Sequence, residues 1–168
     1  MELTARARMC APLACPKFEK WCRTATMAGV RITASVPTVC ATCKTAGELQ
    51  VWQSIRDGNL TWSEEFSCNC GHAFEANEKG LPPMAIRKAL LEAGEYELVL
   101  TSADGRAAGQ KILKALLNVT ERQSAAQLAA IPAKMYVGTQ VECMFVAEAM
   151  KRLGVMETRV EKVLGGQA

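Results

Sequence analysis

Hydrophobic residues in the second half of the chain follow two different periods. A helical period of about 3.6 residues predicts amphipathic helices over residues 83–93, 107–119, 121–130 and 140–153. Alternation of apolar and polar residues predicts strands over residues 96–101, 135–137 and 156–161. After residue 95 the predicted order is therefore strand, helix, helix, strand, helix, strand. Helices of this kind bury their apolar stripes on one face of a sheet, so a two-layer α/β domain is expected.

Local signals support these boundaries. Pro83 suits the first turn of a helix, Thr120 is a candidate N-cap, and Thr139 with Glu142 forms a capping box. In the last helix Cys143 lies off the expected stripe. The expected core positions on the four helices are Met84, Ile86, Leu90, Ala93, Ile112, Leu113, Leu116, Leu117, Ala125, Leu128, Val141, Met144, Phe145, Ala149, Met150 and Leu153.

The first half of the chain carries strand and turn signals instead. Residues 30–36 alternate weakly and predict a strand. Asp57-Gly58 separates two short runs rich in aromatic and β-branched residues, which is a strong signal for a β-hairpin. Residues 75–80 are polar, and Pro82-Pro83 follows them, so we expect a linker and a domain boundary there.

Four cysteines flank the predicted hairpin in two tight pairs. Cys40 and Cys43 are separated by two residues, and Cys68 and Cys70 by Asn69 alone. The hairpin returns the second pair to the first, and four thiolates in a tetrahedron are the preferred ligands of a structural Zn²⁺ ion. Gly71 allows the chain to turn back behind the second pair. The predicted cofactor is therefore zinc, held by Cys40, Cys43, Cys68 and Cys70.

This arrangement resembles the zinc-ribbon family over residues 36–76. In that family the second pair is usually Cys-x-x-Cys-Gly, whereas Ser67 stands here where the spacing would place the first thiol. Cys70 with His72 is thus a rival ligand pair, and His72 is kept as a reserve ligand. A redox role for Cys40 and Cys43 is the weaker alternative, because no helix follows them as a thioredoxin-like site requires.

Composition narrows the class of protein. Apolar residues make up 49% and charged residues 22% of the 168 residues, which is typical of a globular chain. The net charge of +3 is too small to argue for nucleic-acid binding. No apolar run approaches the length of about 20 residues that spans a bilayer, so no membrane contact is expected. Paired cysteines without an apolar signal segment indicate an intracellular, reducing compartment.

The predicted domain organisation has three parts. Residues 1–29 form a basic extension that we expect to be poorly ordered, residues 30–80 the zinc ribbon, and residues 81–164 the α/β domain. Organellar import is a weakly supported alternative for the extension. Its three cysteines, Cys10, Cys15 and Cys22, fit no tight metal-binding spacing. The fold class predicted for the whole chain is α+β.

Three motifs of the second half are similar to a known family. The strand Tyr96–Leu100, the helix Lys111–Thr120, and Ala125–Leu128 followed by Pro132 resemble the C-terminal domain of the bacterial ribosomal stalk protein. The likeness covers about residues 95–162. The same fold is used by the adaptor that hands N-degron substrates to the Clp protease, so the resemblance implies protein binding in translation or proteolysis.

Several positions depart from the stalk family. Lys114 matches one of the family's basic residues, but the next falls on Leu117 and the lysine of the second helix falls near Ala126. The glycine-rich turn after Thr120 is shortened. Recruitment of translational GTPases is therefore not expected, and Lys111 and Lys114 remain the best candidates for a binding surface on this domain.

Signals for catalysis are missing from the sequence. It has a single histidine and no phosphate-binding loop, and four thiolates would leave zinc no open position. We therefore expect a non-enzymatic adaptor or interaction protein with a protein partner. The first alternative is a nucleic-acid-binding ribbon that uses Arg56, Trp52 and Trp62, although packing of both tryptophans in the ribbon is the simpler interpretation. The second alternative is thiol redox or metal handling.

Overall fold

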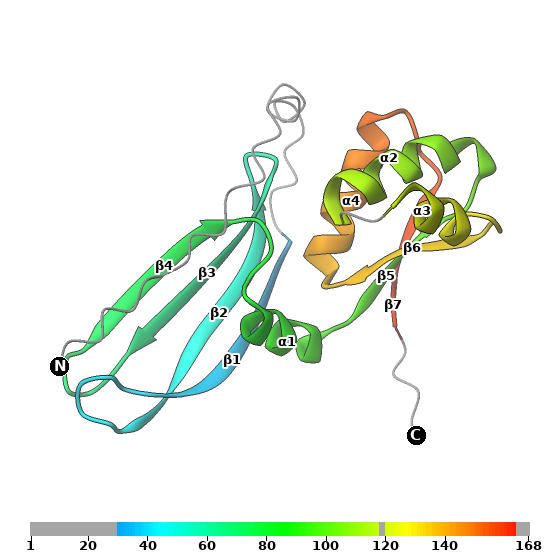
Figure 1. The fold of residues 1–168 in the computed structure, drawn as a ribbon. Helices are drawn as coiled ribbons and strands as arrows, with labels where there is room; N and C mark the ends of the chain where they lie inside the picture. The colour runs from blue at the N-terminus through cyan, green and yellow to red at the C-terminus, as the bar shows by residue number, and fades with distance from the viewer. Residues whose placement is uncertain (1–29, 118–119, 164–168) are drawn as a thin grey trace, which may run out of the picture.

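The computed structural model describes residues 30–117 and 120–163, and within these ranges the chain has an α+β fold (Figure 1). The predicted fold class is confirmed: two antiparallel sheets, of four and three strands, are combined with four α-helices. The predicted extension, residues 1–29, lies outside the described residues together with Cys10, Cys15 and Cys22. No helix of the described part is long and apolar enough to cross a membrane.

The first sheet is a meander in which each strand pairs with the next, in the order β1-β2-β3-β4. Its second turn is the predicted hairpin: Asp57 and Gly58 both have positive φ angles, of 51° and 72°. Two such residues produce the turn whose twist matches paired strands. The strands are β1 (Arg31–Val39), β2 (Ala46–Arg56), β3 (Asn59–Ser67) and β4 (Ala73–Lys79).

The prediction of a linker after the zinc ribbon was wrong, because this segment belongs to strand β4. Residues 75–80 were expected to form a polar linker, but residues up to Lys79 pair with β3, in a register that places Phe66 opposite Phe74 and Thr61 opposite Lys79. An edge strand that no helix covers has no apolar face to reveal it in the sequence. Charged side chains such as Glu75 and Glu78 on an edge also discourage pairing with other chains.

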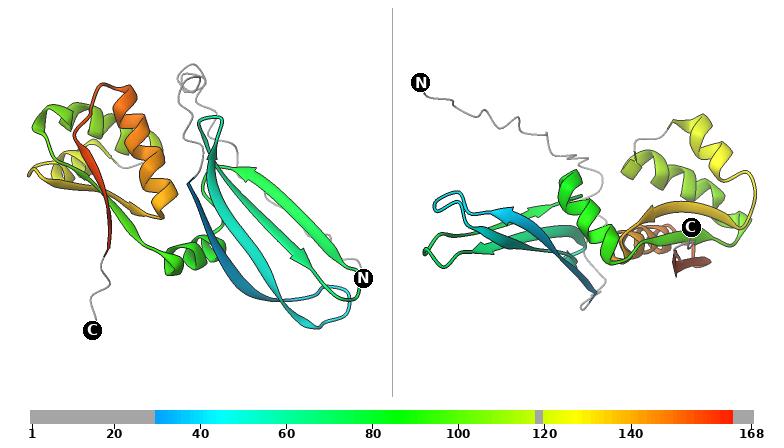
Figure 2. Two further views of the ribbon diagram at one scale, coloured as in Figure 1. Left: turned by 180° about the vertical axis from the view of Figure 1, so that it is seen from behind. Right: turned by 90° about the horizontal axis from the view of Figure 1, so that it is seen from below.

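Helix α1 (Met84–Ala93) packs on one face of the first sheet. Ile86 and Leu90 are buried against Val51 and Trp62. Figure 2 shows the helix lying against the sheet. Ile86 and Leu90 confirm the predicted stripe, whereas Met84 is 77% exposed and Ala93 is exposed too. Helix α1 packs over the β1–β2 part of this face, against Ile32, Ala34, Val36 and Leu49.

The second module has the predicted order of strand, helix, helix, strand, helix, strand. Its sheet has the strand order β6-β5-β7, with the first strand of the module in the centre. A short 3₁₀ turn, Ala103–Gly105, precedes the first of its helices. The elements are β5 (Tyr96–Leu100), α2 (Arg106–Leu117), α3 (Glu121–Gln127), β6 (Ala133–Gly138), α4 (Gln140–Arg152) and β7 (Thr158–Lys162).

The core of the second module lies between the helices and one face of this sheet. Leu98 and Leu100 of β5 meet Leu113 of α2 and Leu128 of α3, all fully buried. Two predictions about inward positions were wrong. Ala125 is exposed and Ser124 is buried in its place, and Cys143, expected off the stripe, is fully buried. The side chains of Leu116 and Leu117 lie outside the described part.

A buried polar cluster joins the two modules. Gln53 of β2 donates a hydrogen bond to the Glu142 carboxylate over 3.2 Å and accepts one from Thr139. Arg87 of α1 donates to both oxygens of Glu142, at 3.0 and 2.8 Å, and the Tyr136 hydroxyl donates to it at 2.9 Å. Because Glu142 is only 1% exposed, its charge depends on these partners. We call Gln53, Arg87, Tyr136, Thr139 and Glu142 the joint.

Candidate metal centre

Two turns place the four cysteines at one end of the first sheet. The β1–β2 and β3–β4 connections lie at the end opposite the β2–β3 hairpin, as Figure 1 shows. Val39 pairs with Ala46, and Ser67 pairs with Ala73, so the ladders continue up to both cysteine-bearing turns. The meander therefore brings together two pairs that are separated by more than twenty residues of sequence.

Backbone hydrogen bonds shape each turn. The Cys40 amide donates to the Thr45 carbonyl at 2.9 Å, and Lys44, with a positive φ of 61°, donates to the Cys40 carbonyl. In the second turn the Cys68 amide donates to the His72 carbonyl at 2.9 Å, and the Gly71 amide donates to Cys68. The φ of Gly71 is +87°, which a glycine adopts without strain. Both turns thus fold their thiols toward the same point.

The four sulfur atoms form one compact group. All lie within 4.8 Å of one another, with Cys40 3.6 Å from Cys70 and Cys43 3.5 Å from Cys68. None is in a disulfide, and Cys40 is fully buried while Cys43 and Cys70 are exposed. The closest contacts run between the two turns rather than within one of them. Such a group can hold a metal ion.

The pKa values of the thiols in this group differ. Hydrogen bonding with the side chain and the backbone of Thr45 lowers the pKa of Cys43 to about 6. The Cys70 amide lowers the pKa of Cys68, but contact with Cys43 and burial outweigh it and raise that pKa to about 12. The Cys43 amide is the main cause that lowers the pKa of Cys40. One sulfur is therefore ready as a thiolate near neutral pH, and a bound cation would displace the remaining protons.

His72, the reserve ligand, lies outside the group of sulfur atoms. Its ring packs beside two phenylalanines, with centroid distances of 6.1 Å to Phe66 and 6.3 Å to Phe74. Phe66 and Phe74 stack at 5.7 Å. A side chain at Gly47 would lie 2.9 Å from the Phe66 ring, so glycine allows this ring to approach the backbone. These rings lie on the same face of the sheet as Trp62 and α1, next to the β3–β4 turn.

The aromatic candidates for nucleic-acid binding lie on opposite faces of the sheet. Trp62 pairs in register with Gln53 and is buried with Leu90 of α1. Trp52 points to the other face, where the Arg31 guanidinium lies 4.4 Å above its ring. Both tryptophans are buried, and Arg56 is exposed at the end of β2. The structure therefore does not bring these three residues together as a stacking platform.

The lysine candidates are exposed on α2. Lys114 pairs with Glu121 at the start of α3, with 3.3 Å between the charged atoms. Lys111 is exposed and has no ion pair in the described part of the chain. Their role in binding stays a prediction.

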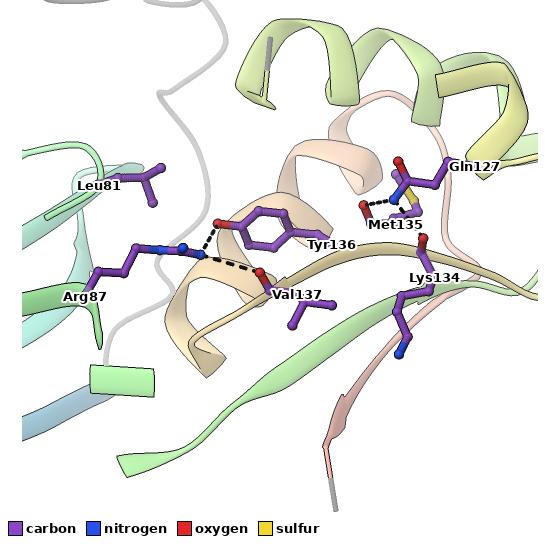
Figure 3. Close-up of a pocket in the computed structure, with 7 residues that line it drawn as sticks. All are labelled: Leu81, Arg87, Gln127, Lys134, Met135, Tyr136 and Val137. Carbon is purple, nitrogen blue, oxygen red and sulfur yellow. Dashed lines mark hydrogen bonds between the residues drawn. The ribbon is translucent and has the colours of Figure 1, made fainter. Parts of the chain in front are cut away.

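A hollow of about 390 Å³ lies along the outer edge of β6 (Figure 3). Gln127 donates to the Lys134 carbonyl at 3.0 Å and to the Met135 carbonyl at 2.8 Å, and Arg87 donates to the Val137 carbonyl at 3.5 Å. The carbonyl groups that an added strand would need are therefore already satisfied along this edge.

Sequence reasoning missed the joint. Glu142 was predicted only as part of a capping box, which is present, with Thr139 accepting from the Glu142 amide at 3.1 Å. Its second role depends on Gln53 and Arg87, which lie 89 and 55 positions away in sequence. The sequence places Gln53 between Trp52 and Ser54 in a strand, which gives no sign that its side chain is buried or which residue it contacts.

Comparisons with protein-family models, with curated proteins and with solved structures found no match to this chain. The resemblances to the zinc ribbon and to the stalk domain therefore stay predictions.

Proposed function

We propose that this protein is a non-enzymatic adaptor whose first sheet is clamped by one structural Zn²⁺ ion, with Cys40, Cys43, Cys68 and Cys70 as ligands. The observation that carries the proposal is the single compact group formed by these four sulfur atoms. Zinc–thiolate bonds of about 2.3 Å in a tetrahedron place sulfur atoms about 3.8 Å apart. The contacts of 3.5 and 3.6 Å between the turns are close to this spacing and far longer than a disulfide bond of about 2.05 Å.

The donor set supports a structural rather than a catalytic ion. Four thiolates fill the tetrahedron, so no position is left for water or substrate. The one histidine packs beside two phenylalanine rings. Zinc would fasten the two turns to each other, and no reaction step is assigned to it.

The charge around the centre favours a protein partner over nucleic acid. Glu48, Glu65 and Glu75 lie on one face of the same half of the sheet, and Glu64 lies on the other. Zinc with four thiolates adds a formal charge of −2. Lys44 is the basic residue within the turns. A surface of this sign repels a phosphate backbone.

Zinc content tests the metal part of the proposal. Purified protein is expected to hold close to one zinc ion per chain by mass spectrometry. Cys40→Ser and Cys70→Ser should lose it, and Cys143→Ala, at a thiol remote from the centre, should keep it. Full zinc in Cys70→Ser, or wild-type protein with four freely titratable thiols and no metal, would refute this assignment.

Binding to RNA and DNA tests the adaptor part. We expect no binding that weakens steeply as salt is raised, which is the mark of phosphate contacts. Tight, salt-dependent binding of RNA by zinc-loaded protein, lost in Arg56→Ala, would replace the adaptor with a nucleic-acid-binding ribbon.

A further inference from the structure

The groove between α4 and β7 differs from the β6 edge in having an open strand beside it. β7 is the other edge of the second sheet and pairs only with β5 in the described part of the chain. The groove has a volume of about 370 Å³. In contrast to β6, no side chain of the described residues donates to a β7 carbonyl between Thr158 and Lys162. An unpaired strand edge beside a helix is a site where an extended peptide can add as a further strand.

The floor and one wall of this groove are apolar. Val160 and Tyr96 come from the sheet, and Met144 and Ala147 come from α4. Met156 stands at one end and is 68% exposed. Methionine side chains adapt to varied apolar partners, so the groove suits one aliphatic side chain of a ligand.

Two lysines beside the groove have no ion pair among the described residues. Lys151 lines the groove and has no ion pair among the described residues, whereas Glu148 is paired with Arg152. Lys162 pairs in register with Tyr96, so it projects to the same side of β7 as Val160. It too is exposed and has no ion pair in the described ranges. The two lysines therefore mark the two ends of a five-residue strand.

We propose that the α4–β7 groove binds an extended, acidic peptide segment of a partner protein, added as a strand along β7. The strand would be about 17 Å long, which is five residues. Every second side chain of the segment would face α4. Its central side chain, aliphatic, would enter between Met144 and Val160, and its first and last, carboxylates, would meet Lys151 and Lys162.

The test uses zinc-loaded full-length protein and the blocked peptide Asp-Thr-Leu-Thr-Asp with a fluorescent label. We expect saturable binding by fluorescence anisotropy, with amide shifts in β7 and α4. Lys-Thr-Leu-Thr-Lys should bind at least tenfold more weakly, because it opposes the lysines. Two N-methylated peptides are compared, one methylated at both threonine amides and one at the leucine amide. Only one of them should lose binding, because alternate amides of an added strand face β7.

Two exposed variants of the protein locate the site without endangering the fold. Lys151→Glu and Met156→Asp should each weaken binding about tenfold, equivalent to about 1.4 kcal/mol. Lys88→Glu on α1 is the matched control and should have no effect. A larger effect of Lys111→Glu than of Lys151→Glu would overturn the proposal in favour of α2.

Two further outcomes would also overturn it. One is equal binding of the acidic and basic peptides. The other is concentration-dependent dimerisation that protects β7 and excludes the peptide, because a second copy would then be the occupant. The proposal rests on the adaptor role but not on the metal centre. Zinc content is measured in the same preparation. If peptide binding fails while one zinc per chain remains, the groove proposal is wrong and the metal-centre proposal still stands.

Discussion

The two sheets of this protein are stabilised in different ways. The three-stranded sheet carries three helices on one face and a continuous core around Leu98, Leu113 and Met150, all fully buried. The four-stranded sheet has α1 on part of one face, and large apolar side chains are exposed at its cysteine end, with Val39 at 59% and Phe74 at 42%. Two antiparallel sheets thus differ: one is covered by a continuous core, and the far end of the other has only the two turns that carry the four cysteines.

The comparison also refines what the metal must do. The core positions expected from the sequence all lie on the predicted helices, and none falls within residues 30–80. The structure shows a small core of Val51, Trp62, Ile86 and Leu90 near the joint. If zinc binds as proposed, it would be needed for the cysteine end of the sheet, because the core with α1 supports the rest.

Removal of the metal should have the largest effect. Structural zinc sites can supply about 10–16 kcal/mol of apparent binding free energy at neutral pH. We expect a strong chelator to abolish amide protection around residues 36–50 and 64–76, as measured by hydrogen exchange. Residues 95–163 should keep their protection. Loss of protection throughout the chain would break the distinction between the modules.

Glu142→Ala should have the next largest effect, because it removes the centre of the joint. Arg87 would lose the contact that raises its pKa and would remain half-buried without a counter-charge. Breaking such a pair typically costs about 3–5 kcal/mol. Urea denaturation with separate probes should show both modules destabilised, and Lys88→Ala, in a solvent-exposed pair with Glu92, should show little change.

Leu90→Ala tests how much α1 contributes to the metal-held sheet. Leu90 is fully buried against that sheet, and such a truncation costs about 2–5 kcal/mol. The four-stranded sheet should lose stability while zinc stays bound at one ion per chain. Simultaneous loss of zinc would mean that the cysteine end depends on α1 after all.

Cys143 should give the smallest of these effects, confined to alkaline pH. Burial, with the Glu142 charge nearby, raises the pKa of this thiol from 9.0 to about 12. A raised pKa in the folded state contributes stability that is complete below pH 9 and is lost as pH rises towards 12. Near pH 10.5 the loss would be about 2 kcal/mol. It should be seen as a difference in urea midpoint between wild type and Cys143→Ala, and be absent at pH 8.

The sequence predicted those parts of the fold that depend on local chemistry. Asp57-Gly58, the capping box at Thr139 and the two cysteine pairs each specify a turn or a helix start within a few residues, and each is present in the structure. The proximity of the four sulfurs followed from the hairpin prediction and is borne out by the group that they form.

The misses depend on contacts between distant segments. β4 is an uncovered edge strand, so its polar residues resemble a linker. Cys143 is buried because α4 packs it against β5, where its thiol donates to the Tyr96 carbonyl at 3.4 Å. Glu142 is buried because α1 and β2 approach it from elsewhere in the chain. The hydrophobic period of a helix or strand indicates which of its faces is buried, but not which distant segments pack against its other faces.

X-ray absorption at the zinc edge of the purified protein is the most direct test of the sulfur clamp. The account predicts four sulfur neighbours at about 2.3 Å and no nitrogen or oxygen neighbour. A spectrum with three sulfurs and one imidazole nitrogen would place His72 in the site, and a protein without zinc but with disulfides between the turns would contradict the account.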